Sequence, residues 1–109
     1  MLLQIYRFDY KSLIFIWNMD IPEIAEKGYT IYTKSECGWC RRAKALLPEA
    51  NMINCDTFLE KDRLTFLEVM RERIGKEHKT FPMVFYDGGF VGGYEDTKNF
   101  IDFDITKDF

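Results

Sequence analysis

The chain is poor in cysteine and histidine. Its 109 residues include three cysteines and one histidine. A small, odd number of cysteines does not fit the dense disulfide scaffold of a small secreted domain. A reducing compartment fits better, and we expect a cytoplasmic protein.

Long hydrophobic runs are also missing. The longest early apolar run, residues 13–17, has five residues, and Arg7 and Asp9 precede it. Such a run is too short for the core of a signal peptide and for a membrane-spanning helix. We therefore expect no membrane partner.

The charge balance lacks an excess of basic residues. Fifteen lysines and arginines stand against 18 acidic residues, which gives a formal net charge of −3. Nucleic-acid binding relies on a basic field that neutralises phosphates. The sequence thus predicts no nucleic-acid partner.

The size and composition are those of one globular domain. Of the residues, 47% are hydrophobic and 17% aromatic, enough for one core in a chain of this length. We assign residues 20–109 to this domain and 1–19 to an N-terminal extension. Two readings of the extension stay open: a β-hairpin added to a sheet edge, or a segment upstream of a start at Met19.

Apolar patterning predicts alternating strands and helices. Expected strands are 29–33, 52–56, 83–86 and 90–91, and expected helices are 21–27, 41–47, 57–74 and 96–103. Asp20 is the expected N-cap of the first helix, and Thr57 with Glu60 forms a capping box for the third, which Gly75 ends. The order strand, helix, strand predicts parallel pairing of the first two strands, and Asp87-Gly88-Gly89 predicts a hairpin.

Two cysteines lie between an expected strand and an expected helix, in the run Cys37-Gly38-Trp39-Cys40. The reactive form of cysteine is the thiolate, which a helix N-terminus stabilises through its free N–H groups and dipole. Lys34, Arg41 and Arg42 add positive charge nearby. We expect redox chemistry in which Cys37, the more exposed thiol, attacks and Cys40 closes a disulfide.

A metal site is the alternative for a Cys-x-x-Cys pair. Two further ligands would be needed, and the chain offers only Cys55 and His78. Cys55, at the end of a short strand, is expected to be a small buried hydrophobic residue. His78, in a polar run, is expected to be a solvated loop residue.

Three separated motifs resemble those of the glutaredoxin family, which has the thioredoxin-like fold. They are Lys34-x-x-Cys37-x-x-Cys40, Thr80-Phe81-Pro82 and Gly92-Gly93-Tyr94-Glu95-Asp96, and the resemblance covers about residues 28–101. It implies an α/β domain with a four-stranded mixed sheet flanked by helices. It also implies glutathione-dependent reduction of protein disulfides and of glutathione mixed disulfides.

The resemblance also implies roles for single residues. Cys37 matches the family's nucleophile and Cys40 its resolving cysteine. Lys34 matches a lysine that lowers the pKa of the nucleophile and pairs with a glutathione carboxylate. Pro82 matches a cis-proline, which lets the backbone of Phe81 hydrogen-bond an extended substrate.

The remaining glutathione contacts implied by the resemblance lie in the third motif and beside the second. Gly93 permits close approach, and the N–H groups of Glu95 and Asp96 match a pocket for the γ-glutamyl carboxylate. The Asp96 carboxylate matches the partner of the γ-glutamyl ammonium. Lys79 stands where the family often has a basic residue.

The sequence departs from the family at the pair between the cysteines. Gly38-Trp39 replaces the common Pro-Tyr of dithiol members, although Trp39 keeps an aromatic wall for glutathione. Tyr94 and Glu95 replace smaller residues, and Tyr94 narrows the pocket. Some relatives with glycine at the position of Gly38 hold a [2Fe–2S] cluster in a dimer with two glutathiones.

Three functions therefore stay open. The first is a monomeric glutathione-dependent oxidoreductase acting on disulfide-bearing proteins. The second is an iron–sulfur carrier, a dimer in which Cys37 is a cluster ligand. The third is a thioredoxin-type reductant reduced by a flavoenzyme.

Overall fold

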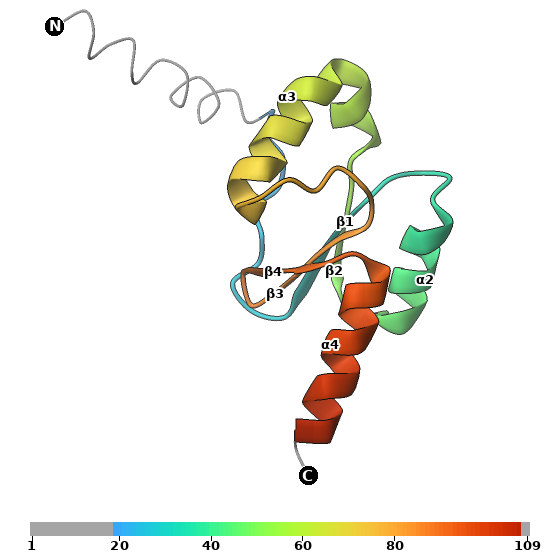
Figure 1. Ribbon diagram of the computed structural model, residues 1–109. Coiled ribbons are helices and arrows are strands. Elements are labelled where there is room, and N and C mark those ends of the chain that lie inside the picture. The colour runs from blue at the N-terminus through green and yellow to red at the C-terminus, as the bar shows by residue number, and fades with distance from the viewer. Residues whose placement is uncertain (1–18, 108–109) are drawn as a thin grey trace, which may run out of the picture.

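The computed structural model describes residues 19–107. The hairpin considered for residues 1–19 lies outside these residues, apart from Met19. Figure 1 shows a sheet flanked by helices. The strands are β1 (Tyr29–Thr33), β2 (Asn51–Asn54), β3 (Met83–Tyr86) and β4 (Gly89–Gly92), and the helices are α2 (Gly38–Leu46), α3 (Asp56–Ile74) and α4 (Tyr94–Lys107).

The four strands form one mixed sheet in the order β2-β1-β3-β4. β1 is parallel to β2 and antiparallel to β3, and β3 and β4 form the antiparallel hairpin. The predicted fold class, parallel pairing and hairpin are therefore confirmed. Among the described helices, none is long and apolar enough to cross a membrane.

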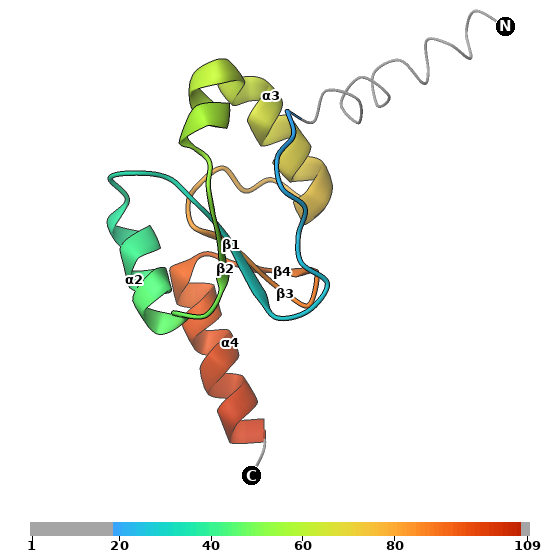
Figure 2. The ribbon, with the colours of Figure 1, turned by 180° about the vertical axis from the view of Figure 1, so that it is seen from behind.

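Successive side chains of the central strands point to opposite faces of the sheet, so the core has one part on each face. Tyr32 and Phe85 pack with Phe66 and Met70 of α3 on one face. Ile31 and Val84 point to the other face and pack with Ala43 of α2 and, at the margin, with Tyr94 of α4. The views in Figures 1 and 2 agree that α3 lies across the sheet from α2 and α4. Both cysteines of the first motif belong to the α3-side cluster.

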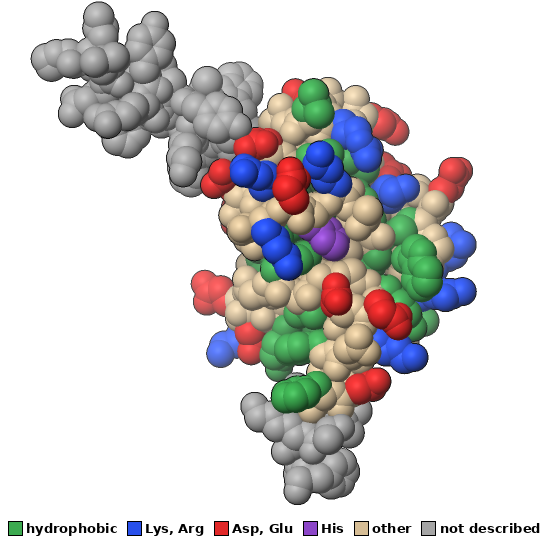
Figure 3. All heavy atoms as spheres, in the orientation of Figure 1, with side chains coloured by type: hydrophobic (Ala, Val, Ile, Leu, Met, Phe, Trp, Pro, Cys, Tyr) green, Lys and Arg blue, Asp and Glu red, His purple; other side chains and the backbone are tan. Residues whose placement is uncertain are grey.

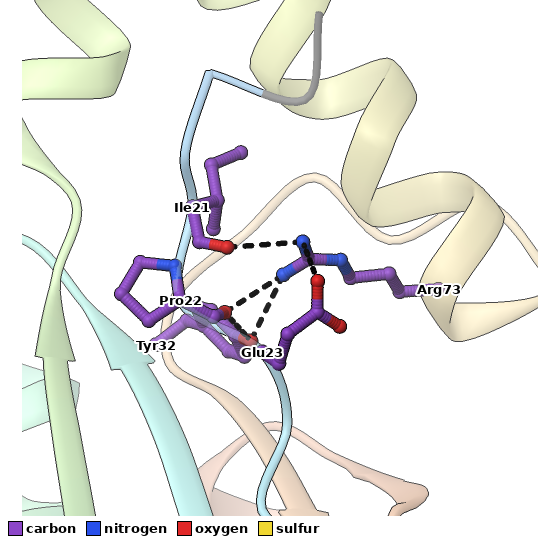
Figure 4. A network of polar contacts seen from close by, with 5 residues as sticks. All are labelled: Ile21, Pro22, Glu23, Tyr32 and Arg73. Carbon is purple, nitrogen blue, oxygen red and sulfur yellow. Dashed lines mark hydrogen bonds and ion pairs between the residues drawn. The ribbon is translucent and has the colours of Figure 1, made fainter. Parts of the chain in front are cut away.

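The helix expected at 21–27 is absent, which corrects the sequence prediction. Asp20 has a positive φ of 58°, unlike the extended conformation of an N-cap. The carbonyls of Ile21 and Pro22 accept hydrogen bonds from the guanidinium of Arg73, at 3.1 and 2.9 Å. The Tyr32 hydroxyl also donates to the Pro22 carbonyl, at 2.6 Å. Figure 4 shows these partners converging on the segment, so its carbonyls bond the rest of the domain instead of a helical turn.

The start of α3 also differs from the expected capping box. The helix begins at Asp56 after Cys55, and the Asn54 side chain accepts the N–H of Asp56 at 2.9 Å. The helix is broken at Asp62, whose carboxylate accepts bonds from the N–H and hydroxyl of Thr65, at 3.1 and 2.7 Å. These bonds lower the pKa of Asp62. Gly75 ends the helix as predicted, with a φ of 91°.

Candidate active site

The two cysteines of the first motif are joined in a disulfide at the start of α2. Cys37 is the N-cap of the helix and Cys40 lies in its first turn, with Cα atoms 5.2 Å apart. Cys37 is 8% exposed and Cys40 5%, so the expected difference in exposure is small. The two cysteines can therefore form a disulfide with each other, as reversible thiol–disulfide exchange within one chain requires.

The sulfur of Cys37 accepts a hydrogen bond from a backbone N–H in the first turn of α2. The N–H of Cys40 donates to Cys37 Sγ at 3.2 Å, and the N–H of Arg41 donates to the Cys37 carbonyl at 3.1 Å. Donors at a helix N-terminus favour negative charge. A thiolate formed at Cys37 would therefore be stabilised by the same geometry.

The second motif lies opposite the disulfide. The Phe81–Pro82 peptide bond is cis, as the resemblance implied, and the Phe81 carbonyl oxygen lies 3.9 Å from Cys37 Sγ. The ring of Phe81 stacks on that of Phe66 in α3, with centroids 6.0 Å apart. The hydrophobic core thus anchors the backbone beside the sulfur.

The third motif adjoins the second at the start of α4. A Cβ on Gly93 would lie 3.8 Å from the Pro82 carbonyl oxygen. The buried Thr97 donates its N–H and its hydroxyl to the Gly93 carbonyl, at 3.0 and 2.7 Å. The Asp96 carboxylate accepts the Gly93 N–H at 3.4 Å, and a side chain on Gly92, where φ is 135°, would overlap that carboxylate.

Trp39 joins the first motif to the third. Its side chain is 53% exposed, and its ring lies 5.5 Å from the ring of Tyr94, between centroids. The guanidinium of Arg42 lies over the indole, 4.7 Å from its centroid. Sequence reasoning gave Tyr94 a place beside the pocket but missed its contact with Trp39, and it missed this role of Arg42.

A hollow of about 420 Å³ opens beside the two cysteines, which form part of its lining. We call it the basic hollow; its lining residues are Thr33, Lys34, Ser35, Glu36, Cys37, Cys40, Arg41, Lys44, Met52 and Asn54. Lys34 is thus brought to the cysteines, as predicted. None of the residues of the second and third motifs lines the hollow.

Ser35 and Asp56 were missed by sequence reasoning. Ser35 donates both its N–H and its hydroxyl to the Asp56 carboxylate, and these bonds, with a smaller effect of Lys34, lower the pKa of Asp56. A signal was present, because residues that follow two parallel strands meet at one edge of the sheet. Ser35 follows β1 and Asp56 follows β2.

Some expected site residues are not joined to the cysteines. Lys79 and Glu95 are exposed, and within the described residues no hydrogen bond or ion pair ties either to the rest of the site. His78 lies in a loop, as predicted, and is only partly exposed to solvent. It is half-buried, with its ring 5.0 Å from the ring of Phe90 between centroids.

Cys55 lies apart from the disulfide, in the core. Its side chain is fully buried, as predicted, and burial raises the pKa of its thiol to about 12. Within the described part of the chain, no three histidine, cysteine or acidic side chains are grouped to hold a metal ion. A zinc site built on both Cys55 and His78 therefore has no support in the geometry.

Comparison with known proteins identifies the family. The family model of glutaredoxin matches residues 29–91. An uncharacterized monothiol glutaredoxin of Caenorhabditis elegans is 37% identical over 80 residues, which are 72% of this chain and 54% of that protein. Glutaredoxin 1 of Rickettsia felis is 37% identical over 67 residues, 58% of this chain and 61% of that protein. The match thus spans little more than half of these relatives.

Solved structures support the same fold. Glutaredoxin 1 of Francisella tularensis, complexed with cacodylate, matches with a TM-score of 0.62 at 24% identity, over 72% of this chain and 96% of that one. A buckwheat glutaredoxin–glutathione complex matches with a TM-score of 0.54 at 23% identity, over 72% of this chain and 73% of that one. The family match over more than half of the chain shows that it belongs to the glutaredoxin family.

Proposed function

We propose that the chain is a glutathione-dependent thiol–disulfide oxidoreductase that acts through Cys37 and Cys40. The observation that carries the proposal is the disulfide at the start of α2, with Cys37 Sγ next to the backbone of Phe81. The attacking sulfur of Cys37 thus lies beside backbone groups of Phe81 that can hydrogen-bond a peptide-like substrate. The buckwheat relative, solved as a complex with glutathione, supports that choice of substrate.

The first step is attack by Cys37. In the reduced protein its thiolate attacks the glutathione sulfur of a protein–glutathione mixed disulfide. A bond forms between Cys37 and glutathione, the mixed disulfide breaks, and the substrate protein leaves as a thiolate that takes up a proton. The N–H of Cys40, 3.2 Å from Cys37 Sγ, stabilises the attacking anion.

The second step restores the enzyme by one of two routes. A second glutathione thiolate attacks the glutathione on Cys37, so that oxidised glutathione leaves and the Cys37 thiolate returns. Alternatively, Cys40 attacks Cys37, releases glutathione and forms the Cys37–Cys40 disulfide, which two glutathione molecules then reduce. Reduction of a protein disulfide uses the second route, with the substrate sulfur in place of glutathione.

Glutathione would lie along the second and third motifs. The backbone of Phe81 bonds its peptide part, and Gly93 leaves room for its γ-glutamyl end. The first turn of α4 presents the N–H groups of Glu95 and Asp96 to the carboxylate, while the carboxylate of Asp96 is the partner of the ammonium. Trp39 forms the outer wall, and Lys34 and Lys79 are the expected partners of the other carboxylate.

An assay separates this function from the thioredoxin-type alternative. Reduction of a glutathionylated peptide is coupled to NADPH oxidation, with glutathione and glutathione reductase in one reaction and thioredoxin reductase in the other. We expect turnover only in the first. Turnover with thioredoxin reductase alone would reject the dependence on glutathione.

We also propose that the domain comprises residues 20–109 and works as a monomer in the cytoplasm. The buried Ile21 and its hydrogen bond from Arg73 support a domain that begins close to residue 20. The iron–sulfur dimer would use Cys37 as its ligand. A visible absorption band after anaerobic purification would favour that alternative.

A further inference from the structure

The basic hollow has a net positive lining. Lys34, Arg41 and Lys44 contribute three cations, while Glu36 is its one acidic lining residue. Among the described residues, no ion pair holds any of these three cations. Lys34 helps to lower the pKa of Asp56, so the charges of these two side chains offset each other. Arg41 and Lys44 then outnumber Glu36 in the lining.

The two arginines after Cys40 lie on different sides of the loop. A terminal nitrogen of Arg41 lies 3.8 Å from the position of a Cβ on Gly38, whereas the guanidinium of Arg42 lies over Trp39. Arg41 lines the hollow and Arg42 does not. In Figure 3, Lys and Arg side chains line the edge of the molecule that α2 forms in Figure 1. The disulfide therefore lies between a basic hollow and an aromatic wall.

A substrate disulfide has two halves, and the two halves need separate places. Glutathione along Phe81, Pro82 and Gly93 would use residues that do not line the hollow, and Lys34 at the rim is the one proposed glutathione partner that does. The other half of the disulfide is the polypeptide that carries the cysteine. The hollow is open and of the size of a small-ligand pocket, large enough for the side chains that flank that cysteine.

The reaction itself favours positive charge on this side. When Cys37 bonds to the glutathione sulfur, the sulfur–sulfur bond of the substrate breaks and its electron pair stays on the polypeptide sulfur. That sulfur leaves as a thiolate before it is protonated. Arg41 and Lys44 would stabilise this anion and any carboxylate beside it.

We propose that the basic hollow binds the polypeptide half of the substrate disulfide and selects segments with Asp or Glu next to the reacting cysteine. This selectivity for acidic polypeptides rests on the proposed function and goes beyond it, because it names the substrate class. The positive side chains supply attraction over several ångströms, so the preference weakens as salt screens it.

The test uses two glutathionylated peptides that differ only in the residues beside the cysteine, two Glu in one and two Lys in the other. The ratio of their kcat/KM values is measured for the full chain, for the double variant R41Q/K44Q and for the control K61Q/R63Q. The control makes the same charge change at exposed positions on α3. A ratio cancels any common effect on the reactivity of Cys37.

We expect the full chain to prefer the acidic peptide at low salt. R41Q/K44Q should reduce the preference about three- to tenfold, since exposed charge pairs each contribute roughly 0.2–1 kcal/mol. The control should keep the preference, and added salt should reduce it in the full chain. The same ratio in the full chain and in R41Q/K44Q would overturn the proposal. A higher KM for glutathione with an unchanged peptide ratio would overturn it too, by assigning the hollow to glutathione.

A second measurement works without glutathione. The variant C40S, reduced, attacks mixed disulfides of the same two peptides with a short neutral thiol, N-acetylcysteamine. Attack on the sulfur of the short thiol joins it to Cys37 and releases the peptide thiol, which is quantified by chromatography. An acidic preference that R41Q removes in the C40S background supports the hollow even if glutathione turnover is absent. Loss of glutathione turnover with this preference intact would reject the proposed function and leave the inference standing.

Discussion

Ser35 donates two hydrogen bonds to the carboxylate of Asp56, from its N–H to Oδ1 at 2.9 Å and from its hydroxyl to Oδ2. These bonds tie the loop that precedes Cys37 to the first turn of α3. The Asn54 side chain in turn accepts the N–H of Asp56 at 2.9 Å. The loop before the attacking sulfur is thus held from the second strand and the helix that follows it.

The bonds to Asp56 predict a pH-dependent contribution to stability. They lower the pKa of Asp56 below its usual 3.8. A lowered pKa in the folded state stabilises the fold above the unfolded-state pKa, and this stabilisation is lost as the pH falls through the folded-state value. The difference in unfolding free energy between the natural chain and D56N should therefore be constant near pH 7 and shrink below about pH 4.

Urea unfolding at a series of pH values measures this difference. E60Q, a change at an exposed residue of α3, serves as the control and should show a smaller pH dependence. A difference for D56N that stays constant down to about pH 2 would show that the carboxylate charge is not what Ser35 stabilises.

Substitution of Cys37 and substitution of Cys40 should have different effects on activity. C37S removes the nucleophile and should abolish reduction of both glutathionylated peptides and protein disulfides. C40S should keep reduction of glutathionylated peptides, since a second glutathione can release the product, and should lose most of the reduction of protein disulfides. Initial rates with the two substrate types give the answer, and equal losses for both variants would contradict the assigned roles.

Two arginines on the same turn of α3 should differ in their contribution to stability. The side chain of Arg73 is 12% exposed and donates to the carbonyls of Ile21 and Pro22 and to the hydroxyl of Tyr32. Arg71 is 50% exposed and pairs with Glu68 at 3.4 Å. R73M should lower the unfolding free energy by about 2–4 kcal/mol. R71M should cost at most about 0.5 kcal/mol.

Chemical denaturation of the two variants, with circular dichroism as the signal, compares them directly. The substitution is the same in both, so a difference reports the surroundings of each guanidinium. Equal losses of unfolding free energy in R73M and R71M would mean that the hydrogen bonds from Arg73 to the carbonyls of Ile21 and Pro22 make no net contribution to stability.

Burial of Tyr32 raises the pKa of its hydroxyl, so that group stays protonated near neutral pH and can donate to the Pro22 carbonyl.

Cys55 should be inert in the folded protein. Burial raises the pKa of its thiol to about 12, so the thiolate that reacts with alkylating agents is scarce at pH 8. After reduction of the disulfide, brief treatment with iodoacetamide should modify Cys37 well before Cys55. Mass spectrometry of peptides locates the label, and denaturant should make Cys55 reactive. Rapid labelling of Cys55 in the native protein would show that the junction between β2 and α3 opens readily.

The sheet and the redox pair could be predicted because their signals are local. The β-prone run 29–33, the Asp87-Gly88-Gly89 turn and the Cys-x-x-Cys loop each carry the information within a few residues. The observed strand β1, hairpin and disulfide agree with them. The place of Pro82 opposite Cys37 came from the resemblance, since no local pattern joins residues so far apart in the chain.

The failures come from distant partners. A helix at 21–27 had suitable residues, but Arg73 and Tyr32 take the carbonyls that it would have used. The capping box expected at Thr57 is absent because α3 already begins at Asp56, whose N–H bonds the Asn54 side chain. The break at Asp62, where Thr65 donates to the Asp62 carboxylate, was not foreseen. The basic hollow could not be foreseen because it combines β1, α2 and β2, whose side chains meet only in the fold.

The close approach of Gly92 to Asp96 links two positions in evolution. A side chain at residue 92 would need the space of the Asp96 carboxylate, and the φ of 135° there already disfavours other residues. A descendant that replaced Gly92 would have to displace or shorten the side chain of residue 96, and would so disturb the carboxylate that we assign to the γ-glutamyl ammonium. Mutational drift at the turn before α4 therefore cannot proceed one residue at a time without passing through a form with weaker glutathione binding.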